Sequence, residues 1–398
     1  MRWLVDVTAE LGLALARLPR MTDFNDPQQR LQINPIAVED LLGRAQVVLD
    51  RSGPVGMAKG RRVLVTGAGG SIGSELVRQL ADLEPARLIL VEASEYALYT
   101  IDMELAERFP AVDRRAVIAN VRDRAVIDAL FAEEKPELVF HAAALKHVPL
   151  VEDNPVEGVR TNTFGSRNIA DACIAAGVAA MVMISTDKAV NPTNVMGATK
   201  RLAESYCQAL DLEGRGTRFI TVRFGNVLGS TGSVVPRFQA QLRAGGPITV
   251  THPEMERFFM TIREAVELVL QASALGISQH DEGKIYVLDM GKPVKIVDLA
   301  RQMIRLAGLR PDKDVAIEFT GLRPGEKLFE EIFHGGEQPV PTRQDGILLA
   351  SPRLVQLDEF RAGLAALEDA CRHRDEGTTL ALVKRLVPEF ERMVHEPT

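Results

Sequence analysis

From Arg62 onward, short apolar runs alternate with longer stretches in which apolar residues recur at helical spacing. The short runs predict six strands, at Val63–Thr66, Arg87–Glu92, Ala116–Asn120, Glu137–His141, Ala180–Ser185 and Arg218–Arg223. Helical spacing lies between them, at Ser74–Leu83, Val156–Ala176 and Lys200–Leu212. Strands such as Leu88–Val91 are continuously apolar, as expected when helices cover both faces of a sheet. The alternation therefore predicts an α/β fold built on a doubly wound parallel sheet.

Periodicity and composition divide the chain into an extension, a Rossmann sheet domain, a smaller C-terminal substrate lobe and a helical tail, at residues 1–60, 61–228, 229–350 and 351–398. The smaller lobe is expected to interleave with the sheet, because residues 262–290 read as a helix and strand that return to it. One helix is predicted in the extension, at Val38–Leu49, and two in the tail, at Leu357–Cys371 and Thr378–Leu386. The extension shows no candidate chemistry.

The composition excludes several classes of protein. With 398 residues, 46% of them hydrophobic and 5% aromatic, the chain suits a globular protein with a substantial core. Its 47 basic and 54 acidic side chains leave a formal charge of −7 at pH 7, so no overall basic field would attract nucleic acid. We therefore expect no nucleic-acid partner.

Cysteine usage and the N-terminal segment bear on location. The three cysteines lie far apart in no CxxC or Cys/His spacing, which favours a reducing compartment and argues against a metal site. The apolar stretch Leu11–Ala16 is flanked by charges and falls well short of the roughly 18–20 apolar residues that a spanning helix needs. No signal peptide is recognisable. The sequence therefore predicts a cytoplasmic chain with no membrane span and no metal.

A glycine-rich turn follows the first predicted strand and precedes a helix. Its glycines leave room for a pyrophosphate at the helix N-terminus, where unpaired amides and the helix dipole bind anions. The turn residues expected to touch a cofactor are Gly67, Gly70, Ser71, Ile72 and Gly73. Glu92 closes the second strand 25 positions beyond Gly67, where its carboxylate would bind ribose hydroxyls and repel a 2′-phosphate. The pattern predicts an NAD site, with an ordinary glycine turn as the alternative.

Residues after the third and fourth predicted strands would line the rest of that site. Asn120 and Val121 would flank the adenine, and Ala142 and Ala143 would present small side chains to the cofactor. Ordinary packing accounts for each of these four residues equally well.

Polar residues gather where the fifth predicted strand ends and the next helix begins. The strand ends in Ser185-Thr186-Asp187-Lys188, and the helix opens with Met196-Gly197-Ala198-Thr199-Lys200. Ligands in open α/β sheets bind beyond the carboxyl ends of the strands. We therefore expect Thr186, Asp187, Lys188, Met196 and Lys200 to face the nicotinamide.

Several motifs together resemble the extended short-chain dehydrogenase/reductases that act on nucleotide sugars, and among them the CapD-like polysaccharide-biosynthesis branch. Besides the glycine turn, these motifs are Ala143–Leu150, Ile184–Lys188, Asn191–Asn194, Arg223–Val227, Phe259–Thr261 and Leu322–Lys327. The resemblance runs from about Val38 to about Ala350. Because that branch contains UDP-N-acetylglucosamine 4,6-dehydratases, it implies this activity, NAD as cofactor, and a surface polysaccharide or glycan as the destination of the product.

The implied reaction needs an acid and a base on one face of the sugar. Hydride transfer from C4 to NAD acidifies the C5 proton, water leaves across C5–C6, and the hydride returns to C6. By analogy with related dehydratases, Asp187 would be the acid for the departing hydroxyl and Lys188 the base for the C5 proton. Thr186 would hydrogen-bond the C4 oxygen, and Lys200 would bind the nicotinamide ribose. A lysine base must be neutral, so we expect the proximity of Lys200 and of the nicotinamide charge to lower the pKa of Lys188.

Met196 departs from the usual pattern, because short-chain dehydrogenases place a tyrosine at this position before the lysine. A thioether is neither acid nor base. The substitution indicates either a site that has lost hydride transfer or one that uses another base for the C4 hydroxyl. Some CapD-like dehydratases also carry methionine here, and the intact Thr186-Asp187-Lys188 favours an active site.

The resemblance also implies residues for the sugar nucleotide. Arginine's planar fork suits phosphate oxygens, and two arginines match those that contact the diphosphate in related enzymes. The residues expected to bind the substrate are Lys146, His147, Asn226, Thr249, Thr251, Arg257, Arg323 and Glu326, with Glu326 on the nucleotide ribose. A surface ion pair is the alternative for each arginine, and a structural role is the alternative for His147.

Two other functions fit part of the pattern. A nucleotide-sugar 4-epimerase shares the oxidation at C4 but needs no acid and base at C5 and C6. A catalytically silent module that binds NAD or a UDP-sugar would account for Met196 and for the unexplained extension. The resemblance further implies a homo-oligomer, a dimer or larger, because Val156–Ala176 occupies the place where related chains commonly pair helices with a second copy.

Overall fold

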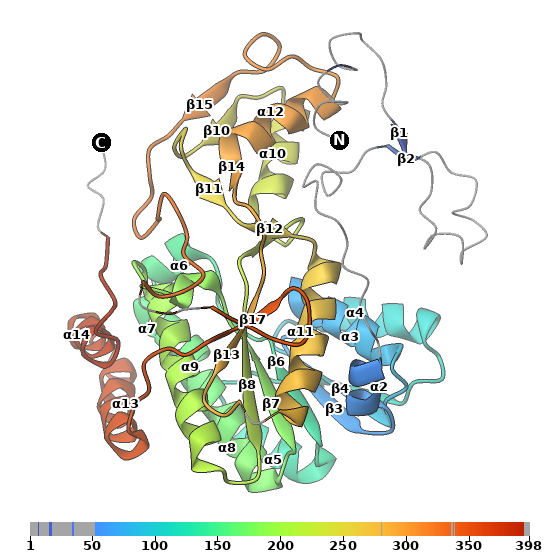
Figure 1. Cartoon of the computed structure of the whole chain (residues 1–398), viewed down its shortest axis with the longest axis vertical. Helices are drawn as coiled ribbons and strands as arrows, with labels where there is room; N and C mark the ends of the chain where they lie inside the picture. Colours follow the sequence, from blue (N-terminus) through green and yellow to red (C-terminus); the bar gives the residue numbers. More distant parts are fainter. Residues whose placement is uncertain are drawn as a thin grey trace.

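The computed structural model describes residues 52–279, 281–335, 337 and 339–393, together with Val7 and two short paired strands, β1 (Ala16–Arg17) and β2 (Asn34–Pro35). A larger lobe contains a central sheet between helices, and a smaller lobe lies beyond one end of the central strands (Figure 1). The helix predicted at Val38–Leu49 lies outside the described residues.

The central sheet contains β3 (Arg62–Thr66), β4 (Arg87–Glu92), β5 (Arg114–Ile118), β6 (Leu138–His141), β7 (Ala180–Ile184), β8 (Arg218–Arg223), β13 (Ile285–Leu288), β16 (Val340–Pro341) and β17 (Ile347–Ala350). Their order is β16-β17-β13-β8-β7-β6-β3-β4-β5, parallel from β5 to β13, with β17 and β16 antiparallel at one edge. The order reverses at β3 and β6, as in a doubly wound Rossmann sheet. The predicted fold class is confirmed.

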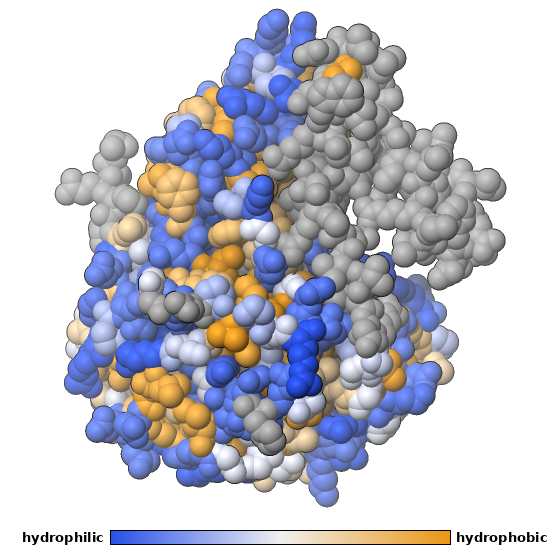
Figure 2. Space-filling view, in the orientation of Figure 1, coloured by the Kyte–Doolittle hydropathy of each residue, from blue (hydrophilic) through white to orange (hydrophobic). Residues whose placement is uncertain are grey.

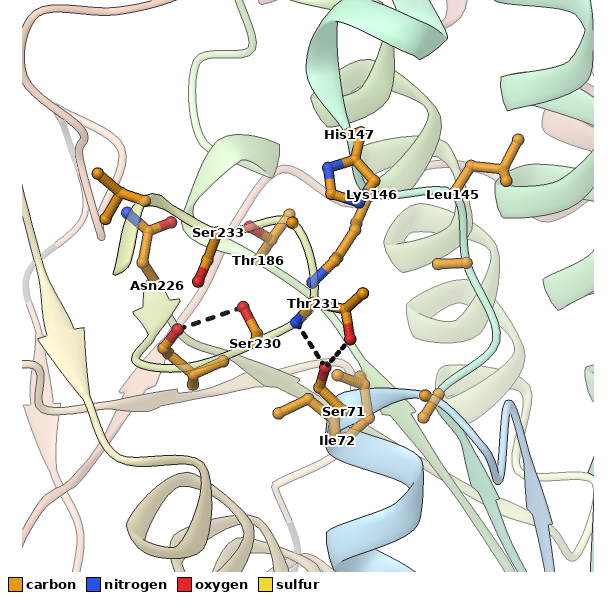
Figure 3. A pocket seen from close by; sticks show the side chains of 18 of the residues that line it. Ser71, Ile72, Leu145, Lys146, His147, Thr186, Asn226, Ser230, Thr231 and Ser233 are labelled. Atoms are coloured by element: carbon orange, nitrogen blue, oxygen red, sulfur yellow. Dashed lines mark hydrogen bonds between the residues drawn. The ribbon is translucent and has the colours of Figure 1, made fainter. Parts of the chain in front are cut away.

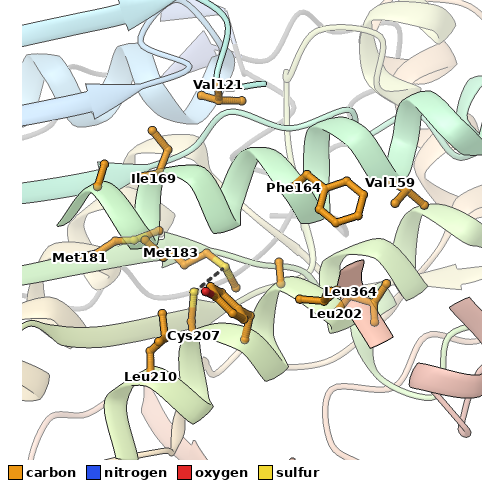
Figure 4. Packing of buried hydrophobic residues seen from close by; sticks show 14 of the residues in the cluster. Val121, Val159, Phe164, Ile169, Met181, Met183, Leu202, Cys207, Leu210 and Leu364 are labelled. Atoms are coloured by element: carbon orange, nitrogen blue, oxygen red, sulfur yellow. Dashed lines mark hydrogen bonds between the residues drawn. The ribbon is translucent and has the colours of Figure 1, made fainter. Parts of the chain in front are cut away.

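Helices cover both faces of the sheet because successive strand residues point to opposite sides. Val63 and Val65 pack with α3 (Ser71–Ala81), α4 (Glu95–Arg108) and α11 (Ile262–Ser278). Leu64 packs on the other face with α5 (Arg124–Glu134), α8 (Ser166–Ala176) and α9 (Val195–Glu213). Figure 4 shows this second cluster, where Met183 and Cys207 meet between sheet and helix. Continuous apolar runs follow from burial on both sides.

The third strand begins two residues earlier than predicted. The apolar run indicated Ala116–Asn120, whereas β5 is Arg114–Ile118. Arg114 and Arg115 form ion pairs with carboxylates of the neighbouring helices, Arg114 with Asp102 and Arg115 with Glu133 and Glu134. An edge strand with one open side tolerates such charges, so apolar residues alone misplace its start.

The predicted helix Val156–Ala176 is interrupted. The structure has α7 (Pro155–Gly158), a π-helical segment η3 (Val159–Gly165) and then α8. In the wide turns, Asn162 Nδ2 donates to Thr199 Oγ1 at 3.0 Å, and Thr163 Oγ1 donates to the Thr199 carbonyl at 3.1 Å. These contacts tie η3 to α9, and π turns commonly mark functional sites. Hydrophobic spacing cannot separate a π turn from an α turn.

The smaller lobe is made of short pairs of strands and two helices. The strands are β9 (Asn226–Val227) with β12 (Phe259–Met260), β10 (Ile248–Val250) with β15 (Ile317–Phe319), and β11 (Glu256–Arg257) with β14 (Val294–Lys295). The helices are α10 (Val234–Arg243) and α12 (Ile296–Leu306), packed around a separate apolar cluster that includes Phe238 and Met303. The remaining short helices of the larger lobe are α2 (Ser52–Ala58), α6 (Val148–Glu152) and the 3₁₀ turn η4 (Asp187–Ala189).

The tail folds back onto the larger lobe. Its helices α13 (Leu357–Arg372) and α14 (Glu376–Leu386) lie beside α7 and α9 in Figure 1. Leu364 and Val383 are buried in the same apolar cluster as Phe164 of η3. The tail therefore covers a face of η3 and α9, in the region where we expected a second copy of the chain to pair.

The described part of the chain contains no helix that is long and apolar enough to cross a bilayer. On the face seen in Figure 2, hydrophobic side chains of the larger lobe form small groups among hydrophilic ones. Such scattered exposure is ordinary for a folded protein surface.

Candidate active site

A cleft of about 910 Å³ lies between the carboxyl ends of the strands and the smaller lobe. The predicted residues that line it are Gly70, Ser71, Ile72, Gly73, Glu92, Ala142, Lys146, His147, Thr186, Lys188, Met196, Lys200, Asn226, Thr249, Thr251, Arg257, Arg323 and Glu326. Those that do not line it are Gly67, Asn120, Val121, Ala143 and Asp187. Residues from distant parts of the sequence therefore meet in one cavity.

The glycine turn between β3 and α3 brings the first residues of α3, Ser71, Ile72 and Gly73, to the cleft. Gly67 has a φ of +66°, a left-handed conformation that favours glycine. A Cβ on Gly73 would lie 1.9 Å from the Gly67 carbonyl oxygen, and a Cβ on Gly67 would lie 2.7 Å from the Ala143 amide nitrogen. The N-terminus of α3 at Gly70 has no side-chain cap. Gly67 and Ala143 therefore support the turn from behind, and the first amides of α3 can bind an anion.

Glu92 lies at the end of β4 and faces the cleft. Its carboxylate accepts hydrogen bonds from the amides of Gly69 at 3.1 Å, Ala93 at 2.9 Å and Ser94 at 3.1 Å. These contacts fix an anionic group beside the glycine turn. A carboxylate in this place suits ribose hydroxyls and disfavours a further phosphate.

Asn120 and Val121 serve local structure. The Asn120 side-chain oxygen accepts a hydrogen bond from the Arg122 amide at 3.1 Å, and Val121 is buried against η3. Neither side chain lines the cleft.

Thr186, Asp187 and Lys188 form a hydrogen-bonded group in η4, directly after β7. Asp187 Oδ1 accepts from Thr186 Oγ1 at 2.9 Å and from Lys188 Nζ at 3.0 Å. The Asp187 side chain is fully buried, and its Oδ2 atom has no hydrogen-bond partner in the described part of the chain. Thr186 and Lys188 face the cleft, with Asp187 behind them.

Lys188 is held as a cation. Its Nζ atom also donates to Asn226 Oδ1 at 3.1 Å and lies 3.7 Å from Glu330 Oε1. Although burial lowers the pKa of Lys188, the charges of Asp187 and Glu330 outweigh it, and the pKa is raised above its ordinary value. The expected lowering by Lys200 does not occur, because Asp187 and Glu330 raise the pKa by more than burial and Arg257 lower it. The expected effect of the nicotinamide charge stays a prediction.

Lys200 and Met196 lie on the first turns of α9. Burial lowers the pKa of Lys200 to about 8, against a smaller opposing effect of Glu204. Met196 is 3% exposed and contributes only its apolar side chain to the cleft wall. The second lysine is therefore easier to deprotonate than Lys188.

A buried polar layer lies beneath these groups. His141 at the end of β6 is hydrogen-bonded to Thr66 Oγ1 at 2.7 Å and Ser166 Oγ at 2.9 Å, and burial lowers its pKa to about 3. Glu204 accepts from Ser185 Oγ at 2.6 Å and from both nitrogens of an Arg223 fork, at 2.9 and 2.7 Å. Such satisfied pairs fix the end of β7, and with it the group in η4.

Cationic side chains gather on the smaller-lobe side of the cleft. Arg257 is tied to the main chain, donating to the Lys327 carbonyl at 2.7 Å and the Leu328 carbonyl at 3.1 Å. Burial and the neighbouring charge of Arg323 lower the pKa of Arg237, which donates to Thr249 Oγ1 at 3.0 Å. Burial also lowers the pKa of Lys146. Gathered positive charge of this kind suits an anionic ligand such as a diphosphate.

The loop at residues 230–233, Arg237 and Glu330 were not predicted from the sequence as parts of the site or its surroundings. Ser230, Thr231, Gly232 and Ser233 line the cleft. Figure 3 shows Thr231 meeting Ser71 of the glycine turn, where the Thr231 amide donates to Ser71 Oγ at 3.1 Å, and Lys146 pointing toward this contact. One glycine and two serines in this loop were the available signal. Nothing local marked Arg237 or Glu330.

The described residues contain no cluster of three or more His, Cys, Asp or Glu side chains that could hold a metal ion.

A family model and several curated relatives match this chain. The model of a family described as polysaccharide biosynthesis protein matches residues 63–352. The capsular polysaccharide biosynthesis protein CapD of Staphylococcus aureus is 49% identical over 82% of this chain and 54% of its own length. An inverting UDP-N-acetylglucosamine 4,6-dehydratase of Campylobacter jejuni is 33% identical over 75% of this chain and 85% of its own. The chain thus spans about half the length of the first of these curated relatives.

A solved structure shares the fold. A dTDP-glucose 4,6-dehydratase double mutant from Streptomyces venezuelae, solved with NAD bound, superposes with a TM-score of 0.59 over 81% of this chain and 99% of its own, at 20% identity. At this identity the likeness concerns the fold.

Proposed function

Because this chain belongs to the polysaccharide biosynthesis protein family, we propose that it is an NAD-dependent nucleotide-sugar 4,6-dehydratase acting on UDP-N-acetylglucosamine. The observation that carries the proposal is the pair formed by Asp187 and Lys188, which joins a carboxylate to an ammonium at 3.0 Å beside the cleft. A 4,6-elimination needs one group to remove the C5 proton and one to protonate the C6 oxygen. The product would serve surface polysaccharide or glycan synthesis.

The residues of the glycine turn fit NAD. A side chain at Gly73 would overlap the Gly67 carbonyl, so the bare turn keeps the backbone close and the α3 amides accessible to a pyrophosphate. Glu92 would hold the ribose hydroxyls and Lys200 the nicotinamide ribose. When bound, NAD supplies reversible hydride acceptance. The NAD-bound structure of the same fold and the acidic Glu92 support this cofactor.

Asp187 and Lys188 together hold one transferable proton. In the free protein it resides on Lys188, whose pKa is raised. Its transfer across the 3.0 Å contact to Asp187 would give a neutral amine for the C5 proton and a carboxylic acid for the C6 hydroxyl. Thr186 donates a hydrogen bond to Asp187 in the free protein, and with substrate bound it would donate to the C4 oxygen. This exchange accommodates the roles that the sequence resemblance implies, although Lys188 starts as a cation.

The substrate's diphosphate would lie against the cationic side of the cleft. Arg323 and Arg257 would contact its oxygens, with Glu326 on the nucleotide ribose and Thr249 and Thr251 beside the base. Lys146, His147 and Asn226 line the same cleft. The positive charge of Arg237, Arg323 and Lys146 in the cleft supports an anionic ligand here.

Mass spectrometry of the protein incubated with UDP-N-acetylglucosamine and NAD, in water and in heavy water, tests the function. A 4,6-dehydratase releases a 4-keto product lighter by one water, and it incorporates deuterium at C5 from heavy water. An epimer of unchanged mass would instead establish the 4-epimerase. Binding without turnover would establish the silent module.

A further inference from the structure

A buried carboxylate behind the cleft has no role in the reaction as described. Glu330 lies in the loop after Leu322–Lys327, and its side chain is 4% exposed. It does not line the cleft. Its Oε1 atom lies 3.7 Å from Lys188 Nζ and 3.8 Å from Arg257 Nε. Each distance exceeds a hydrogen bond, so the carboxylate acts on both cations mainly through its charge.

Neighbouring contacts fix the position of this loop. The Leu328 carbonyl accepts from the Glu256 amide at 3.2 Å, and Lys327 Nζ donates to the Val190 carbonyl at 3.2 Å. Glu331, the next residue, pairs with Lys327 at 2.9 Å and accepts from Asn191 at 3.1 Å. The loop is thus bound to β11 on one side and to the end of η4 on the other. Because the loop is fixed on both sides, the backbone position of Glu330 is fixed as well.

We propose that Glu330 is a positioning residue for the dehydratase, whose buried carboxylate holds Lys188 as an ammonium ion against Asp187. This inference rests on the proposed function, because the catalytic role of Lys188 is taken from it. The charged groups facing Lys188 are Asp187, Glu330 and Arg257, and Asn226 Oδ1 accepts a hydrogen bond from its Nζ atom. Of these, Asp187 would change its own charge during the reaction. Glu330, away from the substrate, supplies the constant negative charge.

Removing the negative charge of Glu330 changes the pKa of Lys188 in a predictable direction. Glu330 favours the protonated form of Lys188, so Glu330→Gln lowers the pKa of the amine while keeping the size of the side chain. At this separation and burial, the expected shift is about one pH unit or more. The limb of the pH–rate profile that belongs to Lys188 moves to lower pH, whether the amine or the ammonium form reacts. If the neutral amine reacts, this is the rising limb of the profile; if the ammonium form reacts, it is the falling limb.

Competitive acetylation measures the pKa of Lys188 directly. The full-length protein is treated with trace labelled acetic anhydride at a series of pH values, and the peptide that contains Lys188 is quantified by mass spectrometry. We expect the midpoint for Glu330→Gln to lie about one pH unit or more below that of the wild type. Equal midpoints would overturn the proposal. If Glu330 had only a structural role, Glu330→Gln would lower the melting temperature and leave the acetylation midpoint of Lys188 unchanged.

Glu331→Gln is the matched control, because Glu331 neighbours Glu330 and pairs with Lys327. Its Lys188 midpoint should equal that of the wild type. If Glu330→Gln does not fold, Glu330→Asp withdraws the charge by one methylene, and a smaller shift in the same direction is expected. An unchanged midpoint in Glu330→Asp contradicts the proposal.

The labelling needs no substrate, so it separates the two hypotheses. If the wild type forms no 4-keto product, the proposed function fails while the Lys188 midpoints still test Glu330. If the product forms, the pH profile of kcat for Glu330→Gln should move by the same amount as the midpoint. A change confined to KM would contradict the proposal.

Discussion

Two lysines of one cleft differ in pKa because their surroundings differ. Lys188 lies within 4 Å of the carboxylates of Asp187 and Glu330, and its pKa is raised. Burial dominates at Lys200, and its pKa falls to about 8. The cleft therefore contains both a lysine that is held as a cation and a second lysine that loses its proton more readily.

Lys200→Met should stabilise the NAD-free protein at pH 7. The folded pKa of about 8 lies below the unfolded value of 10.5, so the unfolded chain binds more protons between these pH values. Stability therefore rises with pH through this window, and the full cost of the buried charge is present below pH 8. We expect a gain of up to about 3 kcal/mol at pH 7.

Denaturant unfolding at pH 7 and pH 10.5 measures this effect. The gain from Lys200→Met should shrink at the higher pH, and NAD binding should weaken. Lys59→Met, at an exposed lysine, serves as the comparison and should leave the dependence unchanged. If the free energy of unfolding depended on pH in the same way in the wild type and in Lys200→Met, the lowered pKa of Lys200 would be contradicted.

At the scale of elements, close contact between α9 and η4 sets the position of Lys188. Gly197 lies in the first turn of α9, and a Cβ there would lie 2.0 Å from the Lys188 carbonyl oxygen. Asn194 caps the same turn by accepting from the Gly197 amide at 2.8 Å. The glycine allows helix and strand end to approach this closely.

Gly197→Ala should therefore displace η4 and impair the reaction. We expect a loss of stability of about 1–3 kcal/mol from overpacking and a fall in kcat of at least about tenfold, because the amine moves away from the sugar. Gly56→Ala, in α2 with no atom within 4 Å of the added Cβ, should keep wild-type activity and stability within about 1 kcal/mol. Wild-type kcat in Gly197→Ala would show that the close contact does not position Lys188.

At the scale of the whole molecule, the end of the described chain connects both lobes. The Glu391 amide donates to the Pro192 carbonyl at 2.9 Å, and the Gly325 amide donates to the Met393 carbonyl at 2.9 Å. Arg392 pairs with Glu152 at 2.9 Å, and Glu152 accepts from the Val195 amide at the start of α9. This segment thus joins the start of α9 to the loop that carries Arg323 and Glu326.

Arg392→Ala should weaken substrate binding more than NAD binding. The change leaves one oxygen of the buried Glu152 carboxylate without its cation, at a cost of about 1–3 kcal/mol. We expect a several-fold rise in KM for the sugar nucleotide and an unchanged NAD affinity by calorimetry. Arg385→Ala, on the exposed side of α14, should match the wild type. Equal effects on both ligands would mean that the segment supports the fold as a whole.

The sequence by itself determined the features that depend on near neighbours along the chain. Apolar runs specified β3 to β8 to within two residues at each end. The inner strands are apolar throughout because they are buried on both faces, whereas the edge strand β5 begins with charged residues and was displaced by two residues. The glycine turn and the polar strand end at Thr186–Lys188 were visible because they too consist of near neighbours along the chain. Parallel topology then brings both to one edge of the sheet.

Only the tertiary structure decided the protonation state of Lys188 and the surface against which the tail helices pack. Protonation of Lys188 depends on Glu330, which lies far along the sequence and reaches it through a loop. The tail that covers η3 and α9 shows the same dependence, since amphipathic helices reveal an apolar face but not what it packs against. Electrostatic and packing energies depend on distance in space, which a linear pattern does not contain.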